Sequence, residues 1–158
     1  MVGDIAKAIR LDFPSHPPLL IGALKAAFVF MADLARALEM DCGVDFIQSA
    51  SYGKRDSPST EVLITRDITA SIRDRDVIIV EGITDRGHTA KAIMDYLSAK
   101  EPASLRLCSL LARSGVKRDV TVDYAGAYVE PGFIVGYGMD YKERFRHLPG
   151  IYVIETGK

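Results

Sequence analysis

Residues 76 to 90 read DVIIVEGITDRGHTA, and the interpretation of the whole chain starts from this stretch. Four consecutive β-branched residues predict a strand over 76–82 that is buried on both faces. Apolar residues at spacings of three and four from Ala90 onward predict a helix. Glu81 and Asp85 therefore lie where a buried strand ends and a helix begins. A helix start leaves backbone N–H groups free, and such groups bind anions.

The alternation of strand and helix continues on both sides of this stretch. Helical spacing recurs from Ala26 to Leu38. Short apolar runs predict further strands over 18–24, 44–51 and 105–111, followed by β-type runs at 124–129, 132–138 and 151–155. The polar segment between Tyr52 and Asp74 contains VLIT, which either pairs as a short hairpin or stays mobile.

Strands that alternate with helices are typical of an α/β domain. We expect a single domain over 1–158, with a mainly parallel, twisted sheet flanked by helices. The chain is 48% hydrophobic, which is enough for one substantial core. Ligands of such sheets bind outside the carboxyl ends of the strands, so chemistry is expected where strand 76–82 ends.

Composition argues against several classes of protein. Lys and Arg number 20 against 21 Asp and Glu, so neither nucleic acid nor an anionic membrane is expected as a partner. Cys42 and Cys108 suit a reducing compartment, and the three histidines lie too far apart for zinc. The N-terminus has no signal-peptide pattern, and charges interrupt the longest apolar stretch. We therefore expect a cytoplasmic protein.

Two interpretations of the turn at Asp85 are open from local chemistry alone. Gly87 allows a sharp turn and a close approach to a ligand, and Thr89 could both cap the helix and donate to a phosphate. An ordinary strand-to-helix turn capped by Thr89 would have the same residues. Short glycine motifs are common, so spacing does not decide between a binding loop and a structural turn.

Longer segments resemble one known family. VIIVEGITDRGHT resembles the phosphoribosyl-pyrophosphate signature of type I phosphoribosyltransferases. LLIGALKAAFVFMADLARAL is similar to the pyrophosphate loop and first helix of the hypoxanthine-guanine branch, and DFIQSASYG to its second strand. FIVGYGMDYKERFRHLPGIYVI resembles the C-terminal purine-binding segment of that branch. The resemblance runs in the expected order from about residue 18 to residue 155.

The resemblance implies a purine-salvage enzyme. Such an enzyme transfers the 5-phosphoribosyl group of phosphoribosyl pyrophosphate to hypoxanthine or guanine, which gives the nucleoside 5-monophosphate and pyrophosphate. It also implies Mg²⁺ as cofactor, a small C-terminal hood over the purine, and a homodimer or homotetramer. Which purine is preferred does not follow from the sequence.

The resemblance also assigns roles to individual residues. Asp85 would act as the catalytic residue that accepts the purine N7 proton. Ribose and 5-phosphate would contact Glu81, Asp85, Arg86, Gly87, His88 and Thr89. Pyrophosphate would contact Lys25, Ala26 and Arg146. The purine would contact Arg113, Phe133, Ile134 and Asp140. Asp140, with Glu81, would bind the metal ion. Ser51 and Tyr52 would lie on the mobile loop that closes over the site.

Two of these residues also have plain structural interpretations. Lys25 could be a solvated lysine at a strand end, but its apolar neighbours favour a buried, functional side chain. Phe133, judged from the sequence alone, would be an aromatic residue of the core.

Four positions depart from the family pattern. Gly82 stands where a second acidic residue is expected, and Arg86 replaces a small hydroxyl residue. Ala26 replaces a glycine and is expected to make a cis peptide there harder to adopt, and Arg113 replaces a lysine. The chain is either a working, divergent enzyme or a degenerate homologue that binds nucleotide in a regulatory or partner role. On the first alternative, Gly82→Asp is expected to raise catalytic efficiency.

Overall fold

The computed structural model describes residues 1–52 and 61–155 of the chain. In chain order its elements are α1 (Val2–Asp12), β1 (Leu19–Leu24), α2 (Phe28–Leu38), β2 (Val44–Tyr52), β3 (Glu61–Arg66), β4 (Asp76–Thr84), α3 (His88–Ser98), β5 (Ser104–Arg113), β6 (Tyr124–Val129), β7 (Phe133–Val135) and β8 (Tyr152–Ile154).

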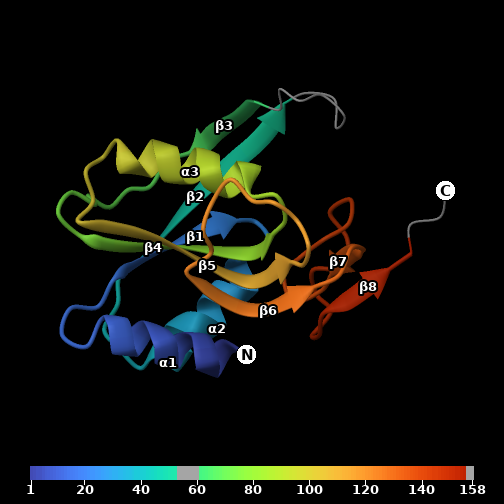
Figure 1. Ribbon diagram of the computed structural model, residues 1–158, viewed down its shortest axis with the longest axis horizontal. Coiled ribbons are helices and arrows are strands. Elements are labelled where there is room, and N and C mark those ends of the chain that lie inside the picture. Colours follow the sequence, from blue (N-terminus) through green and yellow to red (C-terminus); the bar gives the residue numbers. More distant parts are fainter. Residues whose placement is uncertain (53–60, 156–158) are drawn as a thin grey trace.

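Six strands form one sheet in the order β3-β2-β1-β4-β5-β6 (Figure 1). Neighbouring strands are parallel except for β2 and β3, which are antiparallel. The chain first moves outward from β1 to β2 and β3, and then returns to add β4, β5 and β6 on the other side of β1. The strand order therefore reverses between β1 and β4, and α/β sheets bind ligands at such a reversal.

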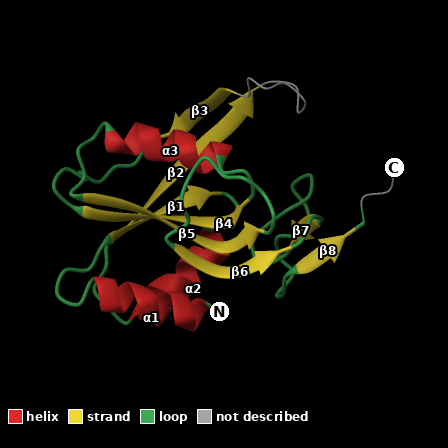
Figure 2. Cartoon of the chain, in the orientation of Figure 1, coloured by secondary structure: helices red, strands yellow, loops and turns green. Residues whose placement is uncertain are grey.

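Helices cover both faces of this sheet. α1 and α2 pack together on one face, and α3 lies on the other (Figures 1 and 2). β4 contributes to both halves of the core, because Ile78 and Val80 pack toward α1 and α2 while Val77 and Ile79 pack toward α3. Burial on both faces explains why the sequence of β4 is a continuous apolar run.

β7 and β8 form a separate two-stranded antiparallel sheet beyond the end of β6 (Figure 1). We call residues 130–155 the hood. Its segment after β7 is joined to α2 by the Tyr137 hydroxyl, which donates a hydrogen bond to the Asp33 carboxylate. The C-terminal part of the chain therefore contacts the helix that follows β1.

The structure confirms the predicted fold, a single α/β domain with a mostly parallel sheet flanked by helices. The VLIT run belongs to β3 and pairs with β2, so the hairpin alternative is confirmed for the described part of that segment. α1 has no counterpart in the sequence prediction. Its buried residues Ile5, Ala6 and Ile9 have helical spacing, and this signal could have predicted the helix.

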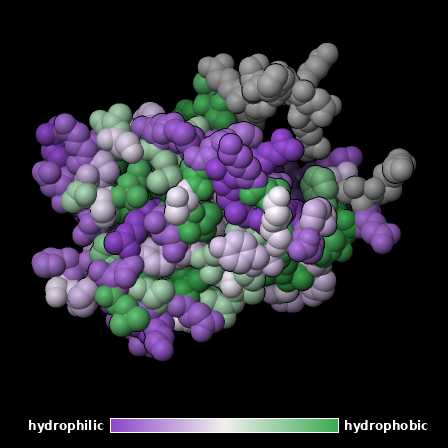
Figure 3. All heavy atoms as spheres, in the orientation of Figure 1, coloured by the Kyte–Doolittle hydropathy of each residue, from purple (hydrophilic) through white to green (hydrophobic). Residues whose placement is uncertain are grey.

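Hydrophilic and hydrophobic side chains are interspersed on the face of the molecule seen in Figure 3. Among the described residues, no helix has both the length and the apolar character needed to cross a membrane. The helices α1, α2 and α3 each have 11 residues, and each buries one side against the sheet.

Candidate active site

A cavity of about 430 Å³ opens at the carboxyl ends of β1 and β4, where the strand order reverses. Three separate segments meet around it, namely the loop after β1, the loop from β4 into α3, and the hood. The lining residues are Ala23, Leu24, Lys25, Ala26, Ser49, Glu81, Gly82, Ile83, Thr84, Asp85, Arg86, Gly87, His88, Thr89, Ala90, Asp140 and Arg146. Most of the residues predicted from the sequence to bind ligand therefore lie around one cavity.

The loop from β4 into α3 turns sharply at Gly87, which has a positive φ of 85°. A Cβ atom at this position would lie 2.6 Å from Val120 Cγ2, so a glycine is required both for the backbone conformation and for the space. Gly87 is also the N-cap residue, and α3 begins at His88. The prediction that Thr89 caps the helix is wrong, because Thr89 already lies within its first turn.

A second loop supports this turn from outside the cavity. The backbone N–H of Asp119 donates to the Arg86 carbonyl group at 3.3 Å, and the Asp119 carboxylate lies 3.1 Å from His88 Nδ1. Together with Val120 against Gly87, these contacts fix the backbone of residues 86–88. The side chain of Arg86 is exposed to solvent.

Glu81 is buried at the end of β4 and lies in a chain of hydroxyl groups. Its Oε2 atom is 3.0 Å from Thr84 Oγ1, which is 2.9 Å from Ser109 Oγ, and Ser109 donates to the Leu111 carbonyl group. Burial raises the pKa of Glu81 to about 7, and the hydrogen bond from Thr84 opposes this only in part. The carboxyl group therefore changes its charge near neutral pH.

Asp85 follows β4, and its side chain is largely exposed at the cavity. Among the described residues its ion-pair partner is Arg113 at the end of β5, whose Nε atom lies 3.9 Å from Asp85 Oδ2. The two terminal nitrogens of Arg113 donate to the carbonyl groups of Glu130 and Gly132, at the start of the hood. Arg113 is buried and connects β5, the loop after β4 and the hood.

The loop after β1 contains a cis peptide bond between Leu24 and Lys25. Alanine at position 26 therefore does not prevent a cis peptide in this loop. The Ala26 carbonyl oxygen is enclosed by two glycines, since a Cβ atom would lie 3.0 Å from it at Gly82 and 2.9 Å from it at Gly138. The prediction that Lys25 is buried is also wrong, because its side chain is 54% exposed.

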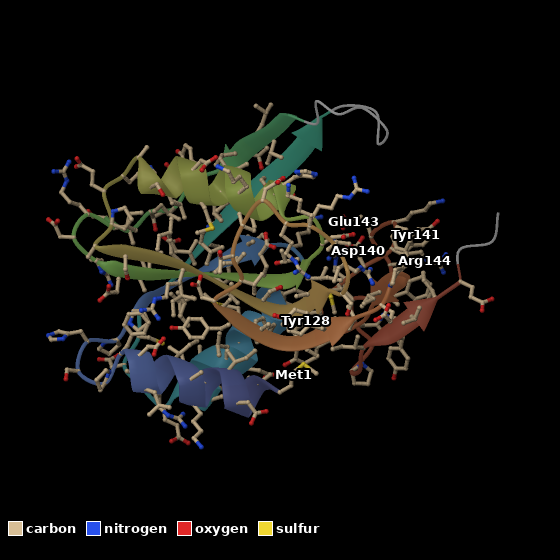
Figure 4. The ribbon with its side chains drawn as sticks, viewed as in Figure 1. Met1, Tyr128, Asp140, Tyr141, Glu143 and Arg144 are labelled. Carbon is tan, nitrogen blue, oxygen red and sulfur yellow. The ribbon has the colours of Figure 1, made fainter. Side chains whose placement is uncertain are left out.

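Three charged side chains of the hood form one cluster, which contacts this loop through Glu143. Asp140 and Glu143 lie side by side (Figure 4), and the Glu143 backbone N–H donates to Asp140 Oδ2 at 2.7 Å. Arg146 Nη2 lies 2.9 Å from Asp140 Oδ1 and 3.2 Å from Glu143 Oε1. Glu143 also forms an ion pair with Lys25, with 2.8 Å between Oε2 and Nζ. The sequence prediction did not include Glu143.

The other predicted residues lie at the margin of the cavity or outside its lining. Phe133 is 39% exposed and stacks edge-on against Tyr141 with 4.9 Å between ring centroids, so it is not the core residue that its sequence context favours. Ile134 is buried next to it. Ser51 and Tyr52 end β2, and the loop predicted to close over the site continues into 53–60, outside the described residues.

Comparison with known proteins places this chain in one family. Residues 1–142 match the phosphoribosyl transferase domain family. Hypoxanthine phosphoribosyltransferase of Escherichia coli K12 is 42% identical over 134 residues, which cover 84% of this chain and 75% of that protein. Hypoxanthine-guanine phosphoribosyltransferase of Aquifex aeolicus is 38% identical over 156 residues, which cover 98% of this chain and 88% of that protein.

A solved structure gives the same result in three dimensions. The hypoxanthine-guanine phosphoribosyltransferase of Bacillus anthracis superimposes with a TM-score of 0.92 at 36% identity, over 98% of this chain and 91% of that one. The fold and the site therefore define a type I phosphoribosyltransferase, and the chain belongs to that family. Within the family, its relatives and structural neighbours place it in the hypoxanthine-guanine branch.

Proposed function

We propose that the chain catalyses the transfer of a 5-phosphoribosyl group from phosphoribosyl pyrophosphate to hypoxanthine or guanine in purine salvage. The observation that carries the proposal is the cavity between β1 and β4, around which the loop after β1, the loop around Gly87 and the hood meet. Its relatives in Escherichia coli and Aquifex aeolicus are named for this activity. The products would be the nucleoside 5-monophosphate and pyrophosphate.

The 5-phosphate would bind the backbone N–H groups at the start of α3, around Gly87. A helix start is a ready site for anions, and the contacts of Asp119 and Val120 hold this backbone in place before the ligand arrives. The side chains of Arg86 and Thr89 would add contacts to the phosphate oxygens. Glu81 would contact the ribose from the end of β4.

Asp85 would accept the proton of the purine N7 atom while the bond to the ribose forms. Its exposed carboxylate lies at the cavity and, among the described residues, has one ion-pair partner, Arg113 at 3.9 Å, which leaves it open to contact a purine. Arg113, Phe133, Ile134 and Asp140 would surround the purine on the hood side. Lys25, Ala26 and Arg146 would bind the leaving pyrophosphate.

Mg²⁺ is the cofactor that this reaction implies. Among the described residues, no group of three or more histidine, cysteine or acidic side chains could hold a metal ion by itself. Glu81 and Asp140 nevertheless line the same cavity and offer oxygen ligands. Mg²⁺ is commonly held by one or two carboxylates together with phosphate oxygens of the substrate, so the site suits an ion that arrives with the pyrophosphate. When bound, the ion would neutralise charge on the leaving group.

The test is nucleotide formation by the purified protein. Hypoxanthine, guanine and xanthine would each be supplied with phosphoribosyl pyrophosphate and Mg²⁺, and the nucleotide and the pyrophosphate would be measured. Formation of inosine or guanosine monophosphate supports the proposal. Binding of these nucleotides without turnover would instead favour the degenerate homologue with a regulatory or partner role. A cytoplasmic location and a homodimer or homotetramer stay predictions.

A further inference from the structure

Glu143 is a carboxylate placed between two cations that the proposed function assigns to pyrophosphate. Its Oε2 atom lies 2.8 Å from Lys25 Nζ, and its Oε1 atom lies 3.2 Å from Arg146 Nη2. Lys25 and Glu143 are 118 residues apart in the chain, so the contact exists only because the hood folds back over the loop after β1. An anion of the protein therefore lies against the cations that a diphosphate would need.

The backbone of the hood is bent in a way that places this side chain. Tyr141 and Arg144 exchange two backbone hydrogen bonds of 3.1 Å, with Lys142 and Glu143 as the two central residues of the turn. Both central residues have positive φ, 52° and 62°. Such a turn strongly favours Asn and Gly, and residues with larger side chains adopt it at a cost. Asp140 stabilises it by accepting the Glu143 N–H.

The carboxyl group of Glu143 is ionised at neutral pH. The hydrogen bonds from Lys25 and Arg146 hold the pKa of its carboxyl group below the ordinary value. The pair is nevertheless open to solvent, because the side chains of Lys25 and Glu143 are 54% and 65% exposed. Exposed ion pairs are weak, so a ligand of higher charge can displace the carboxylate.

We propose that Glu143 competes with pyrophosphate for Lys25 and Arg146. In the free protein the Glu143 carboxylate forms ion pairs with both cations, and it leaves them when a diphosphate group binds. The inference rests on the proposed function, because it requires Lys25 and Arg146 to bind pyrophosphate. The competition weakens the binding of phosphoribosyl pyrophosphate and of product pyrophosphate alike. Glu143 therefore sets how strongly the site holds its anion and helps the product to leave.

Calorimetric titration with sodium pyrophosphate and Mg²⁺ tests the proposal. Glu143→Gln keeps the shape of the side chain and removes its charge, and it is expected to bind pyrophosphate about threefold to tenfold more tightly than the wild type. The same variant is expected to be inhibited more strongly by added pyrophosphate during nucleotide formation. Both readouts measure the anion site directly.

Glu101→Gln is the matched control. Glu101 also has a positive φ, 55°, its side chain is 63% exposed, and it forms an ion pair with Arg73. It precedes β5, however, and therefore lies at the amino ends of the strands, away from the cavity. Its substitution by glutamine is expected to leave the affinity for pyrophosphate unchanged.

Three outcomes would overturn the proposal. Equal or weaker binding by Glu143→Gln would show that the carboxylate does not compete, and would leave the proposed function intact. An equal gain in Glu101→Gln would show a general effect of net charge, and would also leave the function intact. Absence of pyrophosphate binding in all three proteins, together with absence of nucleotide formation, would overturn the proposed function and this inference with it.

Discussion

Arg113 lies against Asp85, with 3.9 Å between its Nε atom and a carboxylate oxygen, while its terminal nitrogens donate to the Glu130 and Gly132 carbonyl groups. One planar guanidinium group thus joins the loop after β4 to the start of the hood. A lysine has the same charge but a single nitrogen, so it cannot make all of these contacts at once.

We therefore expect Arg113→Lys to loosen the hood against the purine. Hydrogen bonds from a charged group are worth about 1.5 to 3 kcal/mol each, so loss of one should raise KM for the purine roughly tenfold to a hundredfold. KM for phosphoribosyl pyrophosphate should change little, because Arg113 does not line the cavity around the phosphate loop. Steady-state kinetics with each substrate varied in turn measures the difference. An unchanged KM for the purine would contradict this role.

Asp85→Asn should remove the proton acceptor and keep the shape of the side chain. A well-placed general base contributes about 10²-fold to 10⁴-fold, so kcat should fall by that factor while nucleotide binding is retained. Asp95→Asn is a suitable control, because Asp95 forms an exposed ion pair with Lys91 on α3 and has no role in the site. Full activity of Asp85→Asn would exclude Asp85 as the catalytic residue.

Gly82→Asp is expected to lower activity, contrary to the expectation from the sequence. A Cβ atom at Gly82 would lie 3.0 Å from the Ala26 carbonyl oxygen and 3.2 Å from Met139 Cγ, so the loop after β1 must shift to accept any side chain. Gly82→Ala adds the same Cβ atom without a charge. It should therefore lower activity as well, through a higher KM for phosphoribosyl pyrophosphate. If Gly82→Asp gains activity while Gly82→Ala loses it, the effect of the carboxylate outweighs that of the steric contact.

The buried carboxyl group of Glu81 should make stability depend on pH. Its pKa is raised from the ordinary 4.5 to about 7, so the folded state binds the proton more tightly than the unfolded state does. This stabilisation is present at low pH and is lost as the pH rises from about 4.5 through 7. Between pH 5 and pH 8, the free energy of unfolding of the wild type should fall by about 2 to 3 kcal/mol relative to Glu81→Gln.

Urea unfolding of both proteins at the two pH values, without Mg²⁺ or substrate, measures this difference. The glutamine variant provides the reference because it keeps a hydrogen-bonding side chain that does not titrate in this range. A parallel pH dependence of the two proteins would mean that Glu81 is ionised throughout.

The sequence was sufficient for the features that depend on local pattern. Apolar runs predicted the strands of the main sheet other than β3, for which a mobile segment was the alternative, and the family resemblance predicted which loops would meet, including those around Lys25 and Gly87. α1 was not predicted, although the spacing of Ile5, Ala6 and Ile9 carries the signal. The interpretation of Thr89 as the cap failed because φ of Gly87, and not residue type, decides where α3 begins.

Features that depend on contacts between distant segments could not be predicted. Nothing near Lys25 in the sequence indicates that Glu143 will pair with it, and this pairing also explains why Lys25 remains at the surface. The absence of a carboxylate at position 82 suggested only a lost ligand contact. The close packing of Gly82 against the Ala26 carbonyl group becomes visible only when β4 and the loop after β1 are placed together.

The enclosure of the Ala26 carbonyl group by Gly82 and Gly138 also constrains how this sequence can evolve. A Cβ atom at Gly82 or Gly138 would lie 3.0 or 2.9 Å from this oxygen, so we expect selection against single substitutions there unless the peptide bond between Ala26 and Ala27 also changes its orientation. The three positions should therefore change together among relatives. A lineage that acquires an acidic residue at position 82 should carry a compensating change in the loop after β1.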